Sequence, residues 1–179
     1  RAWCFVNKGE KEKAVPLFER LVAEFRDGYY GPLAQFTLGD YYYGEERYEE
    51  AKAAYEKFIK LFPDHPRVKR AKMLLSNIAE ISAYKFYSQG ELLFDQEKYK
   101  EAIKIFEQVL QKYPRSVYAV SALVNIGASY QAMEDYEKAA EYYRRVIKEY
   151  GNDPNALPQV KFAETQLKNL IEARAITMK

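Results

Sequence analysis

The sequence holds few side chains whose types and spacing could do chemistry. The single histidine, His65, follows Asp64 in a Pro-Asp-His-Pro turn, and the two could ligate a metal, but a solvent-facing turn residue is the favoured interpretation. The single cysteine, Cys4, stands among apolar residues, which is typical of a core position. A cysteine nucleophile needs a base, and the only histidine is remote in sequence. We therefore expect no metal site and no catalytic nucleophile.

Acidic residues, glycines and basic residues give no stronger indication of catalysis. Glutamate pairs such as Glu45-Glu46 and Glu49-Glu50 lie at expected helix starts or exposed faces, where their charge suits the helix dipole. No phosphate-binding pattern, G-x-x-x-x-G-K or G-x-G-x-x-G, occurs. A basic run over 67–72 could meet phosphate, but a net charge of only +2 favours a solvated helix face. The sequence predicts a protein that is not an enzyme, needs no cofactor and binds no nucleic acid.

Composition leaves room for one large domain or a short array of repeats. The chain has 179 residues, 48% of them hydrophobic, and 17 are tyrosines. One cysteine excludes an internal disulfide framework. No run of about 18 apolar residues occurs, so no integral membrane segment is expected. The many tyrosines call for a repeated structural role.

A repeated pattern accounts for many of the aromatic residues. Four segments align on an alanine that is followed after four residues by an aromatic and preceded by twelve residues by a small residue. The alanines, aromatics and small residues are Ala14, Ala51, Ala102 and Ala139; Phe18, Tyr55, Phe106 and Tyr143; and Ala2, Gly39, Gly90 and Gly127. The alanine and the aromatic share one helix face, and the small residue lets an antiparallel helix approach closely. The pattern predicts tandem pairs of antiparallel helices.

The spacing of the alanines predicts one unusually long helix. Successive alanines are separated by 37, 51 and 37 residues, and the extra 14 residues correspond to nearly four helical turns. We expect one helix over 67–94, with a break near Ser88–Gly90 as the alternative. The predicted helices cover 1–7, 10–25, 31–43, 47–61, 67–94, 98–112, 117–132, 135–149 and 156–176.

On these positions the chain resembles the tetratricopeptide repeat family. The second unit carries the family's order of residues as Leu38-Gly39, Tyr42, Tyr48, Ala51, Tyr55, Phe58 and Pro63. The resemblance implies an all-α fold, a right-handed superhelix of helix pairs with one extended central helix. It implies a single domain over 1–179 with units of about 1–28, 31–65, 66–115 and 116–151 and a capping helix over 156–176. Because Ala2 would take the small-residue position of the first unit, we expect a fragment with further repeats upstream.

The resemblance implies a non-catalytic scaffold that binds a protein or peptide partner on a concave surface lined by the first helix of each pair. The family positions that face this surface correspond to Leu33, Phe36, Asp40, Tyr43, Tyr84, Tyr87, Glu91, Phe94, Val124 and Gln131. Their apolar and aromatic character favours a segment with hydrophobic anchors. The alternative is that the long helix or a neighbouring repeat covers part of this surface. Phe36 and Asp40 stand where chaperone-binding members carry Lys and Asn, so a clamp for a terminal carboxylate is not expected.

A narrower resemblance concerns the links between repeats. The segment 113–119 and the 37-residue spacing look like bacterial cell-envelope proteins, both outer-membrane-assembly lipoproteins and periplasmic Tol-Pal coordinators. This implies a periplasmic or envelope-associated location, with a cytoplasmic one as the alternative. Cys4 lies inside a repeat and is not recognisable as a lipid-bearing cysteine. Two other functions stay open: self-association through the N-terminal end around Trp3, and a regulatory module of a larger protein.

Overall fold

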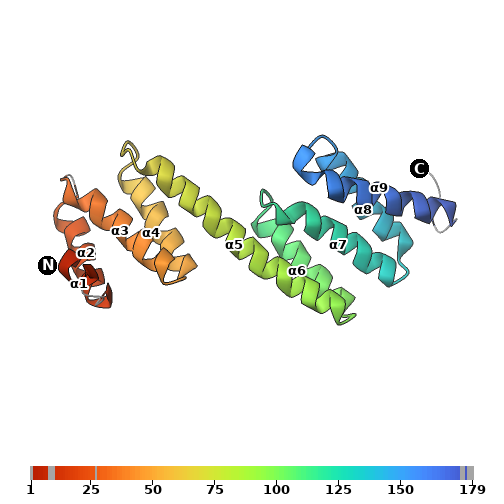
Figure 1. Cartoon of the computed structure of the whole chain (residues 1–179), viewed down its shortest axis with the longest axis horizontal. Helices are drawn as coiled ribbons and strands as arrows, with labels where there is room; N and C mark the ends of the chain where they lie inside the picture. Colours follow the sequence, from red (N-terminus) through yellow and green to blue (C-terminus); the bar gives the residue numbers. More distant parts are fainter. Residues whose placement is uncertain (1, 8–10, 27, 174–175, 177–179) are drawn as a thin grey trace. The chain divides into compact units, whose positions relative to one another are not determined.

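In the computed structural model, which describes residues 2–7, 11–26, 28–173 and 176, the described chain contains helices and no strand (Figure 1). The α-helices are α1 (Ala2–Asn7), α2 (Lys11–Glu24), α3 (Tyr30–Gly44), α4 (Tyr48–Leu61), α5 (Val68–Asp95), α6 (Tyr99–Lys112), α7 (Tyr118–Ala132), α8 (Tyr136–Tyr150) and α9 (Leu157–Glu172). A 3-10 turn, η1 (Pro154–Ala156), precedes α9. The predicted all-α fold of helix pairs is confirmed.

The helix predicted at the C-terminal end is shorter than expected. It was predicted over 156–176, whereas α9 ends at Glu172, with Ala173 as its C-cap. Ile176 is nevertheless buried. An apolar residue at helical spacing therefore marks a position that packs into the core, and spacing alone cannot tell whether the backbone there is still helical.

The chain divides into two compact units, residues 1–78 and 79–179, and the division falls within α5. The prediction of one long helix is confirmed, because α5 runs through Ser88–Gly90 without a break over 28 residues. Unit 1 holds α1 to α4 and the first part of α5. Unit 2 holds the rest of α5 and α6 to α9. Within unit 2, α6 packs on α7, α7 on α8 and α8 on α9 (Figure 1).

Three of the helix pairs, α3–α4, α5–α6 and α7–α8, are closed by a glycine that faces an aromatic ring. A Cβ added at Gly39 would lie 2.4 Å from the Tyr55 ring, and one added at Gly90 would lie 2.5 Å from the Phe106 ring. These separations are shorter than carbon atoms tolerate, so only glycine lets the two helices approach this closely. The predicted role of the small residues is confirmed in both units.

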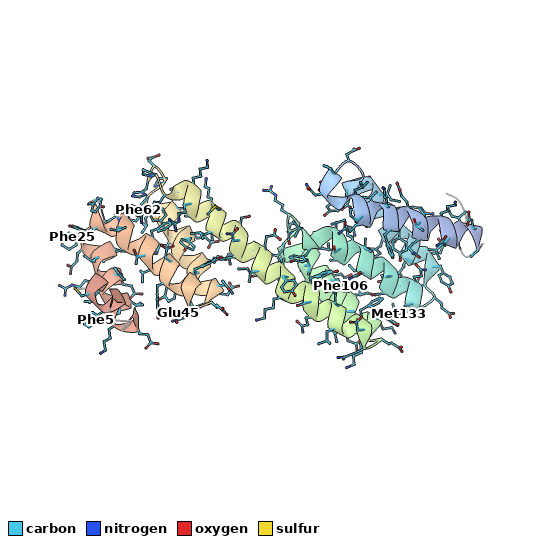
Figure 2. All side chains as sticks on the ribbon, in the orientation of Figure 1. Phe5, Phe25, Glu45, Phe62, Phe106 and Met133 are labelled. Atoms are coloured by element: carbon cyan, nitrogen blue, oxygen red, sulfur yellow. The ribbon has the colours of Figure 1, made fainter. Side chains whose placement is uncertain are left out.

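The two units have separate aromatic cores. In unit 1, Phe36 packs its ring on Tyr55 and Phe58, with centroids 5.5 and 5.2 Å apart. In unit 2, Phe106, labelled in Figure 2, is buried among residues of α5, α6 and α7. Its ring lies 5.7 Å from that of Tyr87. Because the same ring positions recur, most of the aromatic excess serves packing between paired helices.

The turns inside the pairs share a feature that the sequence did not predict. Glu46, Glu97 and Glu134 adopt positive φ values of 57, 59 and 62°. Each precedes a residue whose N–H donates to a carbonyl five residues earlier at 2.9 Å, as Lys98 does to Leu93. This closes the end of the first helix. Glutamate is uncommon in left-handed backbone, so composition gave no sign of it.

Candidate partner-binding surface

The first helices of successive pairs in unit 2 present a matched set of side chains. Three residues of α5 and three of α7 have the same spacing, i, i+3 and i+7, so each trio lies on one face of its helix. We call these six residues the α5–α7 face: Tyr84, Tyr87, Glu91, Tyr118, Ser121 and Asn125. The long helix thus brings three of the predicted partner-binding residues together on one side of unit 2.

Contacts between the two helices hold the tyrosines of the α5–α7 face. The ring of Tyr118 lies 5.4 Å from that of Tyr84 and 5.4 Å from that of Tyr87, measured between centroids. The side-chain amide of Asn125 donates to the Tyr87 hydroxyl at 3.1 Å. Tyr84 keeps 53% of its surface exposed. The face therefore offers an aromatic surface whose rings are already in contact.

The electrostatics of the α5–α7 face are set by Tyr87 and Glu91. Burial, together with the hydrogen bond to Glu91 and the charge of that carboxylate, raises the pKa of Tyr87 to about 12. Hydrogen bonds from Asn125 and Ser121 act in the opposite direction on this pKa. The Tyr87 hydroxyl is thus neutral at physiological pH.

Polar side chains continue this surface from α7 to α9. Gln159 Nε2 donates to Ser121 Oγ at 3.2 Å. Gln131 joins α9 and α8, because its Nε2 donates to Gln166 Oε1 at 3.2 Å and its Oε1 accepts from the Tyr143 hydroxyl at 2.8 Å. Burial raises the pKa of Tyr143 to about 12. The predicted residue Gln131 is therefore held in a network rather than free to turn.

In unit 1 the corresponding residues lie on α3. Asp40 is exposed, and its Oδ1 accepts from the Tyr55 hydroxyl at 2.8 Å. Leu33 is half-buried, and so is Tyr43, whose ring lies 5.8 Å from that of Tyr48. A tyrosine hydroxyl on the second helix thus orients an acid on the first helix of the pair.

Two predicted partner-binding residues are corrected by their burial. Phe36 is 1% exposed and packs on Tyr55 and Phe58, so it belongs to the core of unit 1. Val124 is 9% exposed and belongs to the core of unit 2. Both are large apolar residues on helices that also pack against a second helix. Their side chains are buried in that helix contact and are not available to a partner. Phe94 is half-buried against Tyr99 at 5.3 Å.

Several residues of this surface were missed by sequence reasoning, among them Tyr118, Asn125 and Gln159. On α7 the family positions pointed to Gln131 and to Val124, which stands next to Asn125 and so projects about 100° away around the helix. The signal that could have found two of them is the spacing, since Tyr118 and Asn125 stand three residues before and four after Ser121. This repeats the spacing of Tyr84 and Glu91 around Tyr87.

The structure shows what His65 and Cys4, the two residues considered for metal binding or catalysis, do instead. His65 accepts from the Arg67 N–H at 3.1 Å through Nδ1, and its ring lies 5.3 Å from that of Phe58. Cys4 is exposed, so the prediction of a core cysteine is wrong; on α1 it is Ala2 that enters the core. Trp3 belongs to α1, but its side chain lies outside the described residues.

Searches for a metal group and for a membrane span apply to the described residues. Over these residues, no cluster of three or more His, Cys, Asp and Glu side chains could hold a metal ion. None of the described helices combines the length and the apolar character that crossing a bilayer requires.

Alkaline pH is expected to destabilise the protein. The folded pKa values of Tyr87 and Tyr143, about 12, lie above the ordinary value of 10. Their contribution is therefore complete below pH 10 and is lost as the pH rises toward 12, because the unfolded chain ionises first. At pH 10.5, each of these two tyrosines should lower the free energy of unfolding by about 0.8 kcal/mol relative to its value below pH 10. Urea unfolding at pH 8.0, 9.5 and 10.5 measures this, and Tyr87→Phe should flatten the decline. A free energy of unfolding that stays constant to pH 10.5 would contradict the assignment.

Comparison with known proteins finds helical-repeat relatives. Three family models, each described as tetratricopeptide repeat, match residues 1–28, 32–65 and 79–148. Outer membrane protein assembly factor BamD of Neisseria gonorrhoeae is 28% identical over 145 residues, which cover 78% of this chain and 54% of that protein. BamD of Xylella fastidiosa is 25% identical over 147 residues, covering 80% of this chain and 50% of that protein. This chain spans about half the length of these curated relatives.

Solved structures give matches of lower similarity. The N-terminal domain of stress-induced protein-1 from C. elegans is 21% identical, and the match covers 74% of this chain and 94% of that one with a TM-score of 0.37. A yeast Sti1 structure, titled as a complex of its TPR2AB domain with an Hsp90 peptide, is 16% identical with a TM-score of 0.45. That match covers 97% of this chain and 71% of the other.

Proposed function

Because this chain belongs to the tetratricopeptide repeat family, whose models match three separate stretches of it, we propose that it is a non-catalytic scaffold for protein–protein interaction. Partner binding takes place on the first helices of the pairs. In unit 2 the contact surface is the α5–α7 face, and in unit 1, taken by itself, it is the part of α3 around Leu33, Asp40 and Tyr43. Self-association and a regulatory role are the other functions that such a fold could serve.

One observation carries the proposal: the α5–α7 face exposes aromatic area whose geometry is already determined. Tyr84 is half exposed, yet its ring contacts Tyr118, and Tyr118 contacts Tyr87, whose hydroxyl accepts from Asn125. Aromatic side chains held in this way lose little conformational entropy when a partner binds. They also bury large areas, which is why tyrosines are common where binding energy concentrates.

The cell envelope is the setting that the relatives favour. The BamD proteins to which this chain is similar are named outer membrane protein assembly factors. We extend this to the present chain as part of the proposal: its partner is a component of bacterial envelope assembly. An envelope-associated location follows from the same proposal.

Site-specific photo-crosslinking tests the proposed surface. Benzoylphenylalanine placed at Tyr84 or Gln131 should yield a discrete crosslinked partner in cells that express the protein, because both residues lie on the first helix of their pair. Mass spectrometry of the crosslinked species identifies the partner and shows whether it is an envelope component. We expect at least tenfold more product from these two positions than from a control position.

Lys104 supplies the matched control. It is exposed on α6, the second helix of its pair, so a crosslinker there samples the second helices of the same unit. Equal yields from Lys104 and Tyr84 would move the binding surface away from the first helices. Crosslinks only between copies of this chain would favour self-association instead.

A further inference from the structure

The α5–α7 face carries an acid that differs from many others on the protein. Several exposed carboxylates have a basic partner three or four residues away, for example Glu50 with Arg47 at 2.6 Å and Glu149 with Arg145 at 3.1 Å. Glu91 is exposed, and among the residues that the structure describes no Lys or Arg forms a salt bridge with it. Its charge acts on Tyr87, a neutral hydroxyl four residues earlier on the same helix. Within the described part of the chain, no basic side chain therefore neutralises the negative charge of Glu91.

A second acid, Glu80, adds negative charge where α5 and α7 meet. Glu80 Oε2 accepts from Ser116 Oγ at 2.7 Å and from the Val117 N–H at 3.3 Å, where α7 approaches α5. These donors are neutral, so the charge of Glu80 remains. The nearest basic residue on α5, Lys85, directly follows Tyr84 and so projects about 100° away around the helix.

The tyrosine rings of the α5–α7 face attract cations, as the acids do. The rings of Tyr84, Tyr87 and Tyr118 form one connected cluster, and Tyr84 is largely open to solvent. The face of an aromatic ring carries partial negative charge, which attracts a guanidinium or an ammonium group. On this protein, cations already lie over tyrosines, as Arg47 does at 4.8 Å from the centroid of Tyr42.

We propose that the α5–α7 face receives an arginine or lysine side chain of the partner segment. The cation forms an ion pair with Glu91 and lies beside the ring cluster of Tyr84, Tyr87 and Tyr118, whose member Tyr87 stands one helical turn before Glu91. This rests on the proposed function and deepens it, because it names the chemistry that unit 2 recognises. A partner that offers a terminal carboxylate is disfavoured, since Glu91 repels it.

Two peptides that differ only in charge provide the probe. One is acetyl-Ser-Leu-Arg-Leu-Ser-amide, and the other carries citrulline, the neutral analogue of arginine, at the central position. Backbone ¹H–¹⁵N shifts of the full chain are followed during titration with each peptide. The arginine peptide should bind about tenfold more tightly, with its shifts concentrated on α5 and α7. The preference should shrink as salt is raised from 20 to 300 mM.

Matched variants separate the ion pair from the ring contact. Glu91→Gln should abolish the preference for arginine, whereas Glu101→Gln, an exposed acid on α6, should keep it. Tyr84→Phe retains an aromatic face and should bind the arginine peptide as the wild type does, while Tyr84→Leu should bind it several-fold more weakly. Glu91 and Tyr84 are both exposed, so helicity should be unchanged, and circular dichroism checks this.

The outcomes distinguish this inference from the proposed function. An arginine preference that depends on Glu91 and on an aromatic ring at position 84 supports it. Equal binding of both peptides on α5 and α7 would overturn cation recognition and leave the interaction surface standing. Shifts elsewhere, or no binding of either peptide, would also overturn it, and the crosslinking from Tyr84 would then judge the proposed function on its own.

Discussion

Phe106→Ala is expected to lower the free energy of unfolding of unit 2 by about 3–5 kcal/mol. The ring is fully buried, contacts Tyr87 and fills the space left by the missing side chain of Gly90. Its removal leaves a cavity between α5, α6 and α7. Urea unfolding followed by circular dichroism measures the loss, and hydrogen exchange of the α6 amides assigns it to unit 2.

The Phe106 ring faces Gly90, so the effect of a substitution at Gly90 should depend on whether the ring is present. In the wild type, Gly90→Ala should destabilise, since the new Cβ would lie 2.5 Å from the ring of Phe106. In the Phe106→Ala background the clash is gone, and alanine should stabilise α5 by about 1 kcal/mol through its higher helix propensity. The sign of the effect therefore reverses between the two backgrounds.

Gly44 is the control for this cycle. It ends α3, and a Cβ there would meet nothing within 4 Å, so Gly44→Ala should have the same small effect with and without Phe106. Additive effects of the Gly90 and Phe106 substitutions would show that the glycine does not serve the approach of α6 to α5.

The second large effect is expected at the alanine of the repeat. Ala51→Leu should cost about 1–3 kcal/mol because the side chain is fully buried where α4 meets α3, with no room for three further carbon atoms. Ala53 lies two residues along the same helix and is exposed, so Ala53→Leu makes the same chemical change on the opposite face. It should leave stability within about 0.5 kcal/mol.

The comparison of these two variants tests the register of the repeat. Thermal and urea unfolding of both measure the difference between the buried and the exposed alanine. If Ala51→Leu is as stable as the wild type while Ala53→Leu unfolds early, the helix faces inferred from the alanine–aromatic spacing are reversed.

Most of the fold follows from local spacing along the chain. The alanine, the aromatic four residues later and the glycine twelve residues earlier define both helices of a pair, because helix periodicity places them on facing sides. The step of 51 residues likewise predicted α5, since an insertion of whole turns extends a helix and keeps its apolar face in register. The left-handed turn residues such as Glu97 were not predicted, because a turn within a tertiary hairpin imposes that backbone on a residue that does not favour it.

The candidate site was less accessible to sequence reasoning. Family positions identified Tyr84, Tyr87 and Glu91 on α5, but on α7 they led to Val124, which is buried, and to Gln131 near the end of that helix. The residues that complete the face, Tyr118 and Asn125, depend on which side of α7 turns toward α5. A periodic pattern states which residues share a face, but it does not state which neighbouring helix that face meets.

The sequence by itself determined that the chain forms paired helices, where each helix lies within a residue or two along most of its length, and which residues seal each pair. These properties depend on interactions within about forty residues, where spacing and residue size leave little choice. Tertiary structure alone decided which aromatics are buried and which are offered to a partner, as the contrast between Phe36 and Tyr84 shows. Both are aromatic residues on a first helix, and only the packing of the next helix against each of them separates core from surface.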